Sequence, residues 1–133
     1  MERNVSVKIG KDRYKTEVQI AQHHIIADEP KEVGGTDFGP SPKELFLSSL
    51  GTCKVMTVRM YADRKGWPLD GVEIELSLST QKAELQNTTF VHCRINLLGD
   101  LDDMQRQRLL AIADKCPIHK ILNNPVIIES SLL

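Results

Sequence analysis

The sequence has few cysteines, almost no net charge and no long apolar run. Its 133 residues include three cysteines, an odd number and too low a density for a secreted disulfide-stabilised domain. Seventeen basic residues against eighteen acidic ones leave a net charge of −1, which disfavours a general nucleic-acid or anionic-membrane surface. No apolar run approaches the roughly 18 residues that span a bilayer. These absences predict a protein whose partners include neither nucleic acid nor a membrane.

The same features bear on location and domain number. Residues 1–4 begin a charged, alternating segment that lacks the apolar core of a signal peptide. Together with the low cysteine content, this predicts a cytoplasmic protein with reduced thiols. The chain shows no internal repeat, low-complexity tract or linker, so we expect a single domain over residues 1–133.

The longest predicted element is a helix over residues 42–65. Ser41 is a good N-cap, Pro42 suits the first helical position, and Glu44 completes a capping box three residues after Ser41. Gly66 and Pro68 mark the end of the helix. Five residues at three- and four-residue spacing form its predicted stripe: Phe46, Leu50, Cys53, Thr57 and Met60. Further apolar residues beside that stripe predict a helix that is buried on more than one side.

Alternating apolar residues predict strands before and after this helix. They cover residues 5–9, 14–20, 24–27, 69–80 and 90–98, and a last short strand is expected at residues 126–128. A second helix is predicted from an N-cap at Asp100 to Cys116, with a short turn continuing to Leu122. Its predicted inward residues are Leu101, Met104, Leu109, Ile112, Ala113 and Cys116.

This order of elements predicts an α+β fold, with a long helix between antiparallel sheets. The long helix carries more apolar surface than one thin set of strands covers. We therefore expect a homodimer in which a second subunit covers the rest of that surface.

Two thiols stand out because Cys53 and Cys116 each lie on the apolar stripe of a helix. A pair of inward thiols is what a cycle of sulfenic acid and disulfide formation needs, although buried cysteines also serve as small hydrophobic residues. Cys93, on a predicted strand, fits the second interpretation better. Cys53 lies too deep in its helix for the helix dipole to activate it and needs a neighbouring cation. Cys116 precedes a new turn at Pro117, where free backbone N–H groups would favour a thiolate.

Other uses of these residues find less support. Cys116 and His119 form a Cys-x-x-His pair, and His23 and His24 offer further nitrogens, but zinc sites normally show two such halves. We therefore expect no metal. No Gly-x-Ser-x-Gly motif occurs, so a serine hydrolase is unsupported.

Several segments resemble the OsmC/Ohr family. Residues 27–30, 34–45 and 50–53 read ADEP, GGTDFGPSPKEL and LGTC, and residues 56–62 and 64–69 look like the OsmC-like branch of that family. Residues 113–120, ADKCPIHK, are similar to the segment that carries the family's resolving cysteine.

The resemblance implies an intertwined homodimer with two long central helices and sheets wrapped around them. It also implies a stress-response peroxidase that reduces organic hydroperoxides with an external thiol reductant and without metal, haem or flavin. Cys53 would be the peroxidatic cysteine and Cys116 the resolving one.

Two positions depart from the family pattern. The glutamate ten residues before the cysteine is replaced by Lys43, and Glu44 lies nine before, so Glu44 is either a catalytic residue or only part of the cap. Arg13 lies near the place of the family's activating arginine, but its position in a predicted hairpin connection favours a solvated surface arginine over a catalytic one. A non-catalytic binding module for a small apolar or thiol ligand is the alternative function.

Overall fold

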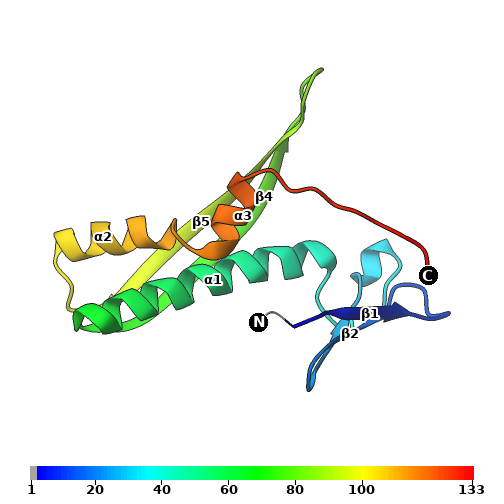
Figure 1. The fold of residues 1–133 in the computed structure, drawn as a ribbon, viewed down its shortest axis with the longest axis horizontal. Helices are drawn as coiled ribbons and strands as arrows, with labels where there is room; N and C mark the ends of the chain where they lie inside the picture. The colour runs from blue at the N-terminus through cyan, green and yellow to red at the C-terminus, as the bar shows by residue number, and fades with distance from the viewer. Residues whose placement is uncertain (1–2) are drawn as a thin grey trace. The chain divides into compact units, whose positions relative to one another are not determined.

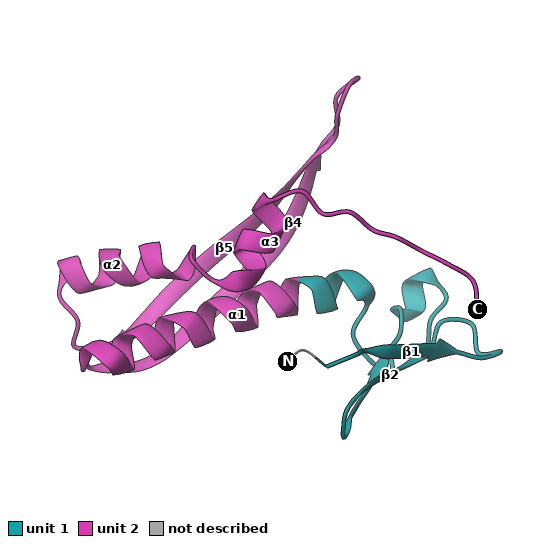
Figure 2. Ribbon diagram, in the orientation of Figure 1, with its two compact units in different colours: residues 1–46 teal, residues 47–133 magenta. Residues whose placement is uncertain are grey.

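The computed structural model describes residues 3–133. The chain divides into two compact units, one ending at Phe46 and the other running from Leu47 to Leu133 (Figure 2). The boundary lies inside helix α1 (Pro42–Lys65), so that helix belongs to both units.

The first unit is built on a three-stranded antiparallel sheet. Its strands are β1 (Ser6–Ile9), β2 (Thr16–Ile20) and β3 (His23–Ala27), in the order β1-β2-β3. A short 3-10 helix, η1 (Lys31–Val33), lies in the glycine-rich loop that follows. The three predicted strands are confirmed, with the second shorter than expected.

Two glycines of this loop are required by close approach of the backbone. A Cβ added at Gly35 would lie 2.0 Å from the carbonyl oxygen of Glu29, and one added at Gly39 would lie 1.9 Å from that of Ile26. Both distances are far below van der Waals contact with atoms that cannot rotate away. The GGTDFG segment is therefore shaped by packing against the end of β3.

The second unit places a long hairpin and two helices around the later turns of α1. Strands β4 (Leu69–Gln81) and β5 (Thr88–Gly99) pair antiparallel, with Leu76 opposite Cys93. Helix α2 (Asp103–Ala113) runs back along the C-terminal half of α1, and α3 (Pro117–Asn123) follows it (Figure 1). The core of this unit consists of Val58, Ala62, Leu69, Leu101, Leu109 and Ala113. The predicted α+β architecture is confirmed.

The buried face of α1 differs from the predicted stripe. It is formed by Leu50, Gly51, Lys54, Val58 and Ala62. Phe46 and Met60, which were expected on the inward stripe, are 41% and 68% exposed. The helix is apolar on several sides, so hydrophobicity alone did not select the face. The face that contains Gly51 is buried because the β4–β5 hairpin packs against it. The contact is so close that a Cβ added at Gly51 would lie 2.6 Å from Leu76 Cδ1.

The second helix also begins and ends at residues other than those predicted. Asp102, not Asp100, is the N-cap, because Gln105 returns the hydrogen bond of a capping box to it. The helix ends at Ala113 instead of Cys116, and residues after Pro117 form helix α3 instead of a turn. Met104, predicted to face inward, is 70% exposed.

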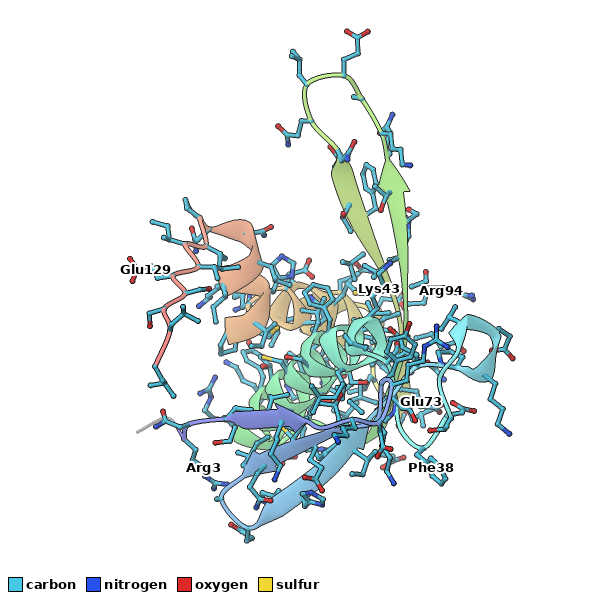
Figure 3. All side chains as sticks on the ribbon, turned by 90° about the vertical axis from the view of Figure 1, so that its right-hand side faces the viewer. Arg3, Phe38, Lys43, Glu73, Arg94 and Glu129 are labelled. Atoms are coloured by element: carbon cyan, nitrogen blue, oxygen red, sulfur yellow. The ribbon has the colours of Figure 1, made fainter. Side chains whose placement is uncertain are left out.

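The strand predicted at residues 126–128 is absent. Within the described part of the chain, residues 124–133 have no strand neighbour to accept their backbone hydrogen bonds, and they form an extended segment. Figure 3 shows Glu129 of this segment standing clear of the helices of its unit. The apolar side chains Val126, Ile127 and Ile128 are 56%, 84% and 85% exposed.

Candidate active site

Cys53 and Cys116 are neighbours in the second unit although 63 positions separate them in the chain (116 − 53). A side-chain hydrogen bond with Cys53 is one of the influences that raise the pKa of the Cys116 thiol. Both cysteines are free thiols, Cys116 is fully buried and Cys53 is partly exposed. The structure thus brings together the two thiols that the sequence analysis selected.

Local sequence explains the position of Cys116. Helix α2 stops at Ala113, and Cys116 adopts the extended backbone of an N-cap before Pro117, the first residue of α3. In the place of a capping oxygen, Cys116 Sγ accepts a hydrogen bond from the backbone N–H of His119 at 3.3 Å. The thiol is therefore held in one orientation by the turn that carries it.

Burial dominates the ionisation of Cys116. Burial is the largest effect and raises the pKa of the thiol, and Cys53 raises it further. The hydrogen bond from the His119 N–H and the charge of Lys54 both lower the pKa, but the net shift is upward. The expected backbone N–H group is present and favours the thiolate of Cys116. It does not offset the loss of water around the sulfur, so the net pKa is raised.

Lys54 is a charged residue of this site that sequence analysis did not identify. It is 2% exposed, and its Nζ donates to Ala113 O at 3.2 Å, Asp114 Oδ1 at 3.1 Å and His119 Nδ1 at 2.8 Å. A buried ammonium is costly unless it is paired and hydrogen-bonded, and all three of its hydrogens have an acceptor here. One sequence signal was available: Lys54 is the sole charged residue of the long helix between Glu44 and Arg59.

Cys93 lies near the same lysine. It is on β5, where burial raises the pKa of its thiol while the charge of Lys54 lowers it and that of Asp114 raises it. The charge of one buried cation, Lys54, thus acts on two thiols, Cys93 and Cys116, and the third thiol, Cys53, directly precedes that lysine in the chain.

Glu44 forms the predicted capping box in the first turn of α1. Its Oε1 accepts from the Ser41 N–H at 2.8 Å, and Ser41 Oγ accepts from the Glu44 N–H at 3.3 Å. The backbone and then the side chain of Ser41 lower the pKa of Glu44, so it is a carboxylate engaged at the helix end. A catalytic role for Glu44 stays a prediction.

Arg13 lies in the first unit, in the connection between β1 and β2. Its guanidinium stands over the Tyr14 ring, 5.4 Å from the centroid, and packs against Gly34, where an added Cβ would lie 3.3 Å from Arg13 Cζ. Arg13 also lines a hollow that includes Lys15 and Phe38. Its proposed part in activating Cys53 remains a prediction.

The donor groups near the thiols do not suit a metal ion. Across residues 3–133 no group of three or more histidine, cysteine, aspartate or glutamate side chains is arranged to hold one. His119 turns Nδ1 towards the Lys54 ammonium, so the Cys-x-x-His pair does not converge as two ligands. No helix in the same range is both long and apolar enough to cross a membrane.

Known proteins share this fold. The family model described as OsmC-like protein matches residues 34–131. No curated protein matches the chain significantly in sequence.

Three solved structures illustrate the likeness of fold. The OsmC-like protein of Mycoplasma pneumoniae is 17% identical, with a TM-score of 0.74 over 92% of this chain and 88% of that one. The organic hydroperoxide resistance protein OsmC of Legionella pneumophila is 19% identical, with a TM-score of 0.70 over 92% and 89%. The organic hydroperoxide resistance protein OhrB of Bacillus subtilis is 23% identical, with a TM-score of 0.65 over 91% and 90%. With the family model matching most of its length, the chain belongs to the OsmC-like protein family.

Proposed function

We propose that this protein is a cysteine-based peroxidase that reduces organic hydroperoxides with an external dithiol. The observation that carries the proposal is the hydrogen-bonding contact between Cys53 of α1 and Cys116, the N-cap of α3, in one unit. A disulfide between neighbouring thiols is what regeneration of the first thiol needs. The hydroperoxide resistance proteins of similar fold support the same chemistry.

The cycle consists of two thiol reactions followed by reduction. The Cys53 thiolate attacks the terminal oxygen of the hydroperoxide, the O–O bond breaks, and the alkoxide takes up a proton and leaves as an alcohol. Cys53 is then a sulfenic acid. Cys116 gives up its proton and attacks the Cys53 sulfur, so that an S–S bond forms and hydroxide leaves as water. Two exchange steps transfer the disulfide to the external dithiol, which is oxidised as both cysteines are reduced.

The different exposure of the two thiols supports different roles for them. Cys53 is partly exposed and accessible to a hydroperoxide, whereas Cys116 is fully buried and its pKa is raised, so it stays protonated at neutral pH. The nucleophile must be a thiolate that substrate reaches, and the resolving thiol needs only to reach the sulfenic acid. Cys53 is therefore the peroxidatic cysteine in this proposal and Cys116 the resolving one.

A binding module is the second candidate. Burial raises the pKa of both Cys116 and Cys93, which is the behaviour of structural thiols. In this alternative the protein binds a small apolar or thiol ligand without turnover.

The remaining proposals concern assembly, domain number and location. We propose a homodimer, a single domain over residues 1–133 and a cytoplasmic location with reduced thiols. Exposed apolar side chains on α1 support the dimer, since Met56 and Met60 are 59% and 68% exposed.

Peroxide consumption in single-cysteine variants tests the proposal. Cumene hydroperoxide and a dithiol are added to the parent and to Cys53→Ser, Cys116→Ser and Cys93→Ser. We expect Cys53→Ser to fall to the protein-free background and Cys93→Ser to match the parent. Cys116→Ser should stop after one turnover with a sulfenic acid at residue 53, detected by dimedone labelling and mass spectrometry. Equal consumption by the parent, Cys53→Ser and Cys116→Ser would remove the peroxidase proposal in favour of the binding module.

A further inference from the structure

Lys54 joins the helix that carries Cys53 to the turn that carries Cys116. Its backbone follows Cys53 directly in α1, and the three acceptors of its ammonium lie between residues 113 and 119. Cys116 lies in the middle of that segment. The buried Lys54 side chain, which is 3% exposed, therefore connects the helix of Cys53 to the segment of Cys116 by hydrogen bonds.

The ammonium also sets the role of the neighbouring histidine nitrogen. An ammonium has three donors and no acceptor, so His119 Nδ1 is the acceptor in this contact. Lys54 thus faces one ring nitrogen, one backbone carbonyl and one carboxylate. That carboxylate, Asp114, lies 3.1 Å from Nζ but is 65% exposed, so water screens part of its charge.

A positive charge with a partly screened counterion acts on the sulfurs nearby. The charge of Lys54 lowers the pKa of Cys116 and of Cys93, opposing the upward effect of burial at each thiol. The charged and titratable groups around it are Cys53 on α1, Cys93 on β5, Asp114 and Cys116 after α2, and His119 on α3. Among them Lys54 is the one group that favours a thiolate by its charge.

We propose that Lys54 is the activating and positioning residue of the thiol pair: it holds the Cys116 turn against Cys53 and supplies the positive charge that lets the pair ionise. The inference rests on the proposed function, because a thiolate is useful only if the pair reacts. In this proposal the buried lysine that follows the peroxidatic cysteine stabilises the thiolate. Asp114 and His119 keep the ammonium in place.

Titration of the thiols separates activation from a merely structural role. Ultraviolet thiolate absorbance is followed against pH in a Cys93→Ser background, which leaves only the pair. We expect Lys54→Met to raise the apparent midpoint of the pair by about one pH unit and to slow its alkylation by iodoacetamide at neutral pH about tenfold. Lys54→Arg should keep most of the charge effect.

The matched control is Lys115→Met, which removes an equal charge beside Cys116 from an exposed position. Its charge is screened by water, so the midpoint should stay within about 0.2 units of the parent. Asp114→Asn should move the midpoint downward, because the amide oxygen still accepts from Lys54 while the negative charge is gone. A structural role alone would loosen the site in both Lys54→Met and Asp114→Asn and would not produce shifts of opposite sign.

The outcomes are distinct from those of the peroxide assay. An unchanged midpoint in folded Lys54→Met overturns this inference even if the parent consumes peroxide. A raised midpoint supports it even if the parent consumes none, in which case the proposed function alone fails. If Lys54→Met does not fold, Lys54→Gln decides the question, because its amide is neutral but still donates hydrogen bonds, and an unchanged midpoint in that variant contradicts the inference.

Discussion

Asp28 is a buried carboxylate whose oxygens are occupied by the loop that follows it. Oδ1 accepts from the N–H groups of Glu29 and Thr36, and Oδ2 accepts from the Thr36 hydroxyl and the Phe38 N–H. These hydrogen bonds favour the charged form, with the Thr36 hydroxyl as the largest cause, and lower the pKa of Asp28 from 3.8 to about 2. The aspartate of the ADEP segment, Asp28, thus holds the glycine-rich loop by hydrogen bonds to Thr36 and Phe38.

Acid unfolding should report this carboxylate. A group whose pKa is lower in the folded state contributes stability above its unfolded pKa of about 3.9, and that stability is lost as pH falls towards 2. We expect Asp28→Asn to be less stable than the parent at neutral pH and to show a flatter loss of stability between about pH 4 and pH 2. Thermal unfolding measured across that range is the check.

Asp37→Asn is the control for this experiment. Asp37 is exposed and has a positive φ of 56°, which asparagine also adopts, so its acid profile should follow that of the parent. An Asp28→Asn profile that overlays the parent would show that the loop does not depend on the ionised carboxylate.

At the scale of single residues, sequence analysis found the thiols but not their cation. Cys53 and Cys116 each sat in a recognisable motif. Lys54 did not, because a lysine on a long helix is normally solvated, and only the tertiary structure covers this one.

At the scale of elements, the start of α2 depends on a reciprocal cap. Asp102 Oδ1 accepts from the Gln105 N–H at 2.8 Å, and Gln105 Oε1 accepts from the Asp102 N–H at 2.9 Å. Asp100, predicted as the N-cap, has Asp103 three residues later, and this position of a capping box calls for glutamate or glutamine.

Two alanine variants measure the difference between these aspartates. Asp102→Ala should lower the free energy of unfolding by about 1 kcal/mol, because the Gln105 N–H at the helix start loses its side-chain acceptor. Asp100→Ala should change it by less than about 0.5 kcal/mol. Chemical denaturation of the two variants tests the assignment, and equal effects would contradict it.

The ends of α1 agree with the prediction, whereas the end of α2 does not. Helix α1 runs from Pro42 to Lys65 as predicted, because capping box, proline and glycine all act locally. The end of α2 was displaced by three residues. Pro117 restricts Cys116, but it does not determine where the preceding turn stops.

At the scale of the whole molecule, much apolar surface of the second unit lies open in a single chain. Met56 and Met60 are exposed on α1, and the segment at residues 126–128 has no strand partner within residues 3–133. Exposed apolar surface of this extent marks an interaction site. These features agree with the proposed homodimer.

Light scattering after size-exclusion chromatography tests that assembly. The parent should elute with twice the mass of one chain, and Met60→Glu should shift towards the monomer or lose thermal stability, because a carboxylate would be buried unpaired in the interface. Leu85→Glu is the control, since Leu85 is fully exposed in the β4–β5 connection and should leave the dimer intact. A monomeric parent, or a Met60→Glu variant as dimeric as the control, would contradict the dimer.

Local signals in the chain predict the family, the α+β order of elements, the bounds of α1 and the two candidate cysteines. These signals are the alternation of apolar residues, helix caps and short motifs. Tertiary contacts instead select the buried face of α1, bury Cys116 so deeply that its thiol form is favoured, and enclose Lys54 among Ala113, Asp114 and His119. Burial and charge pairing arise between segments some 60 residues apart, and no periodicity within either segment records them.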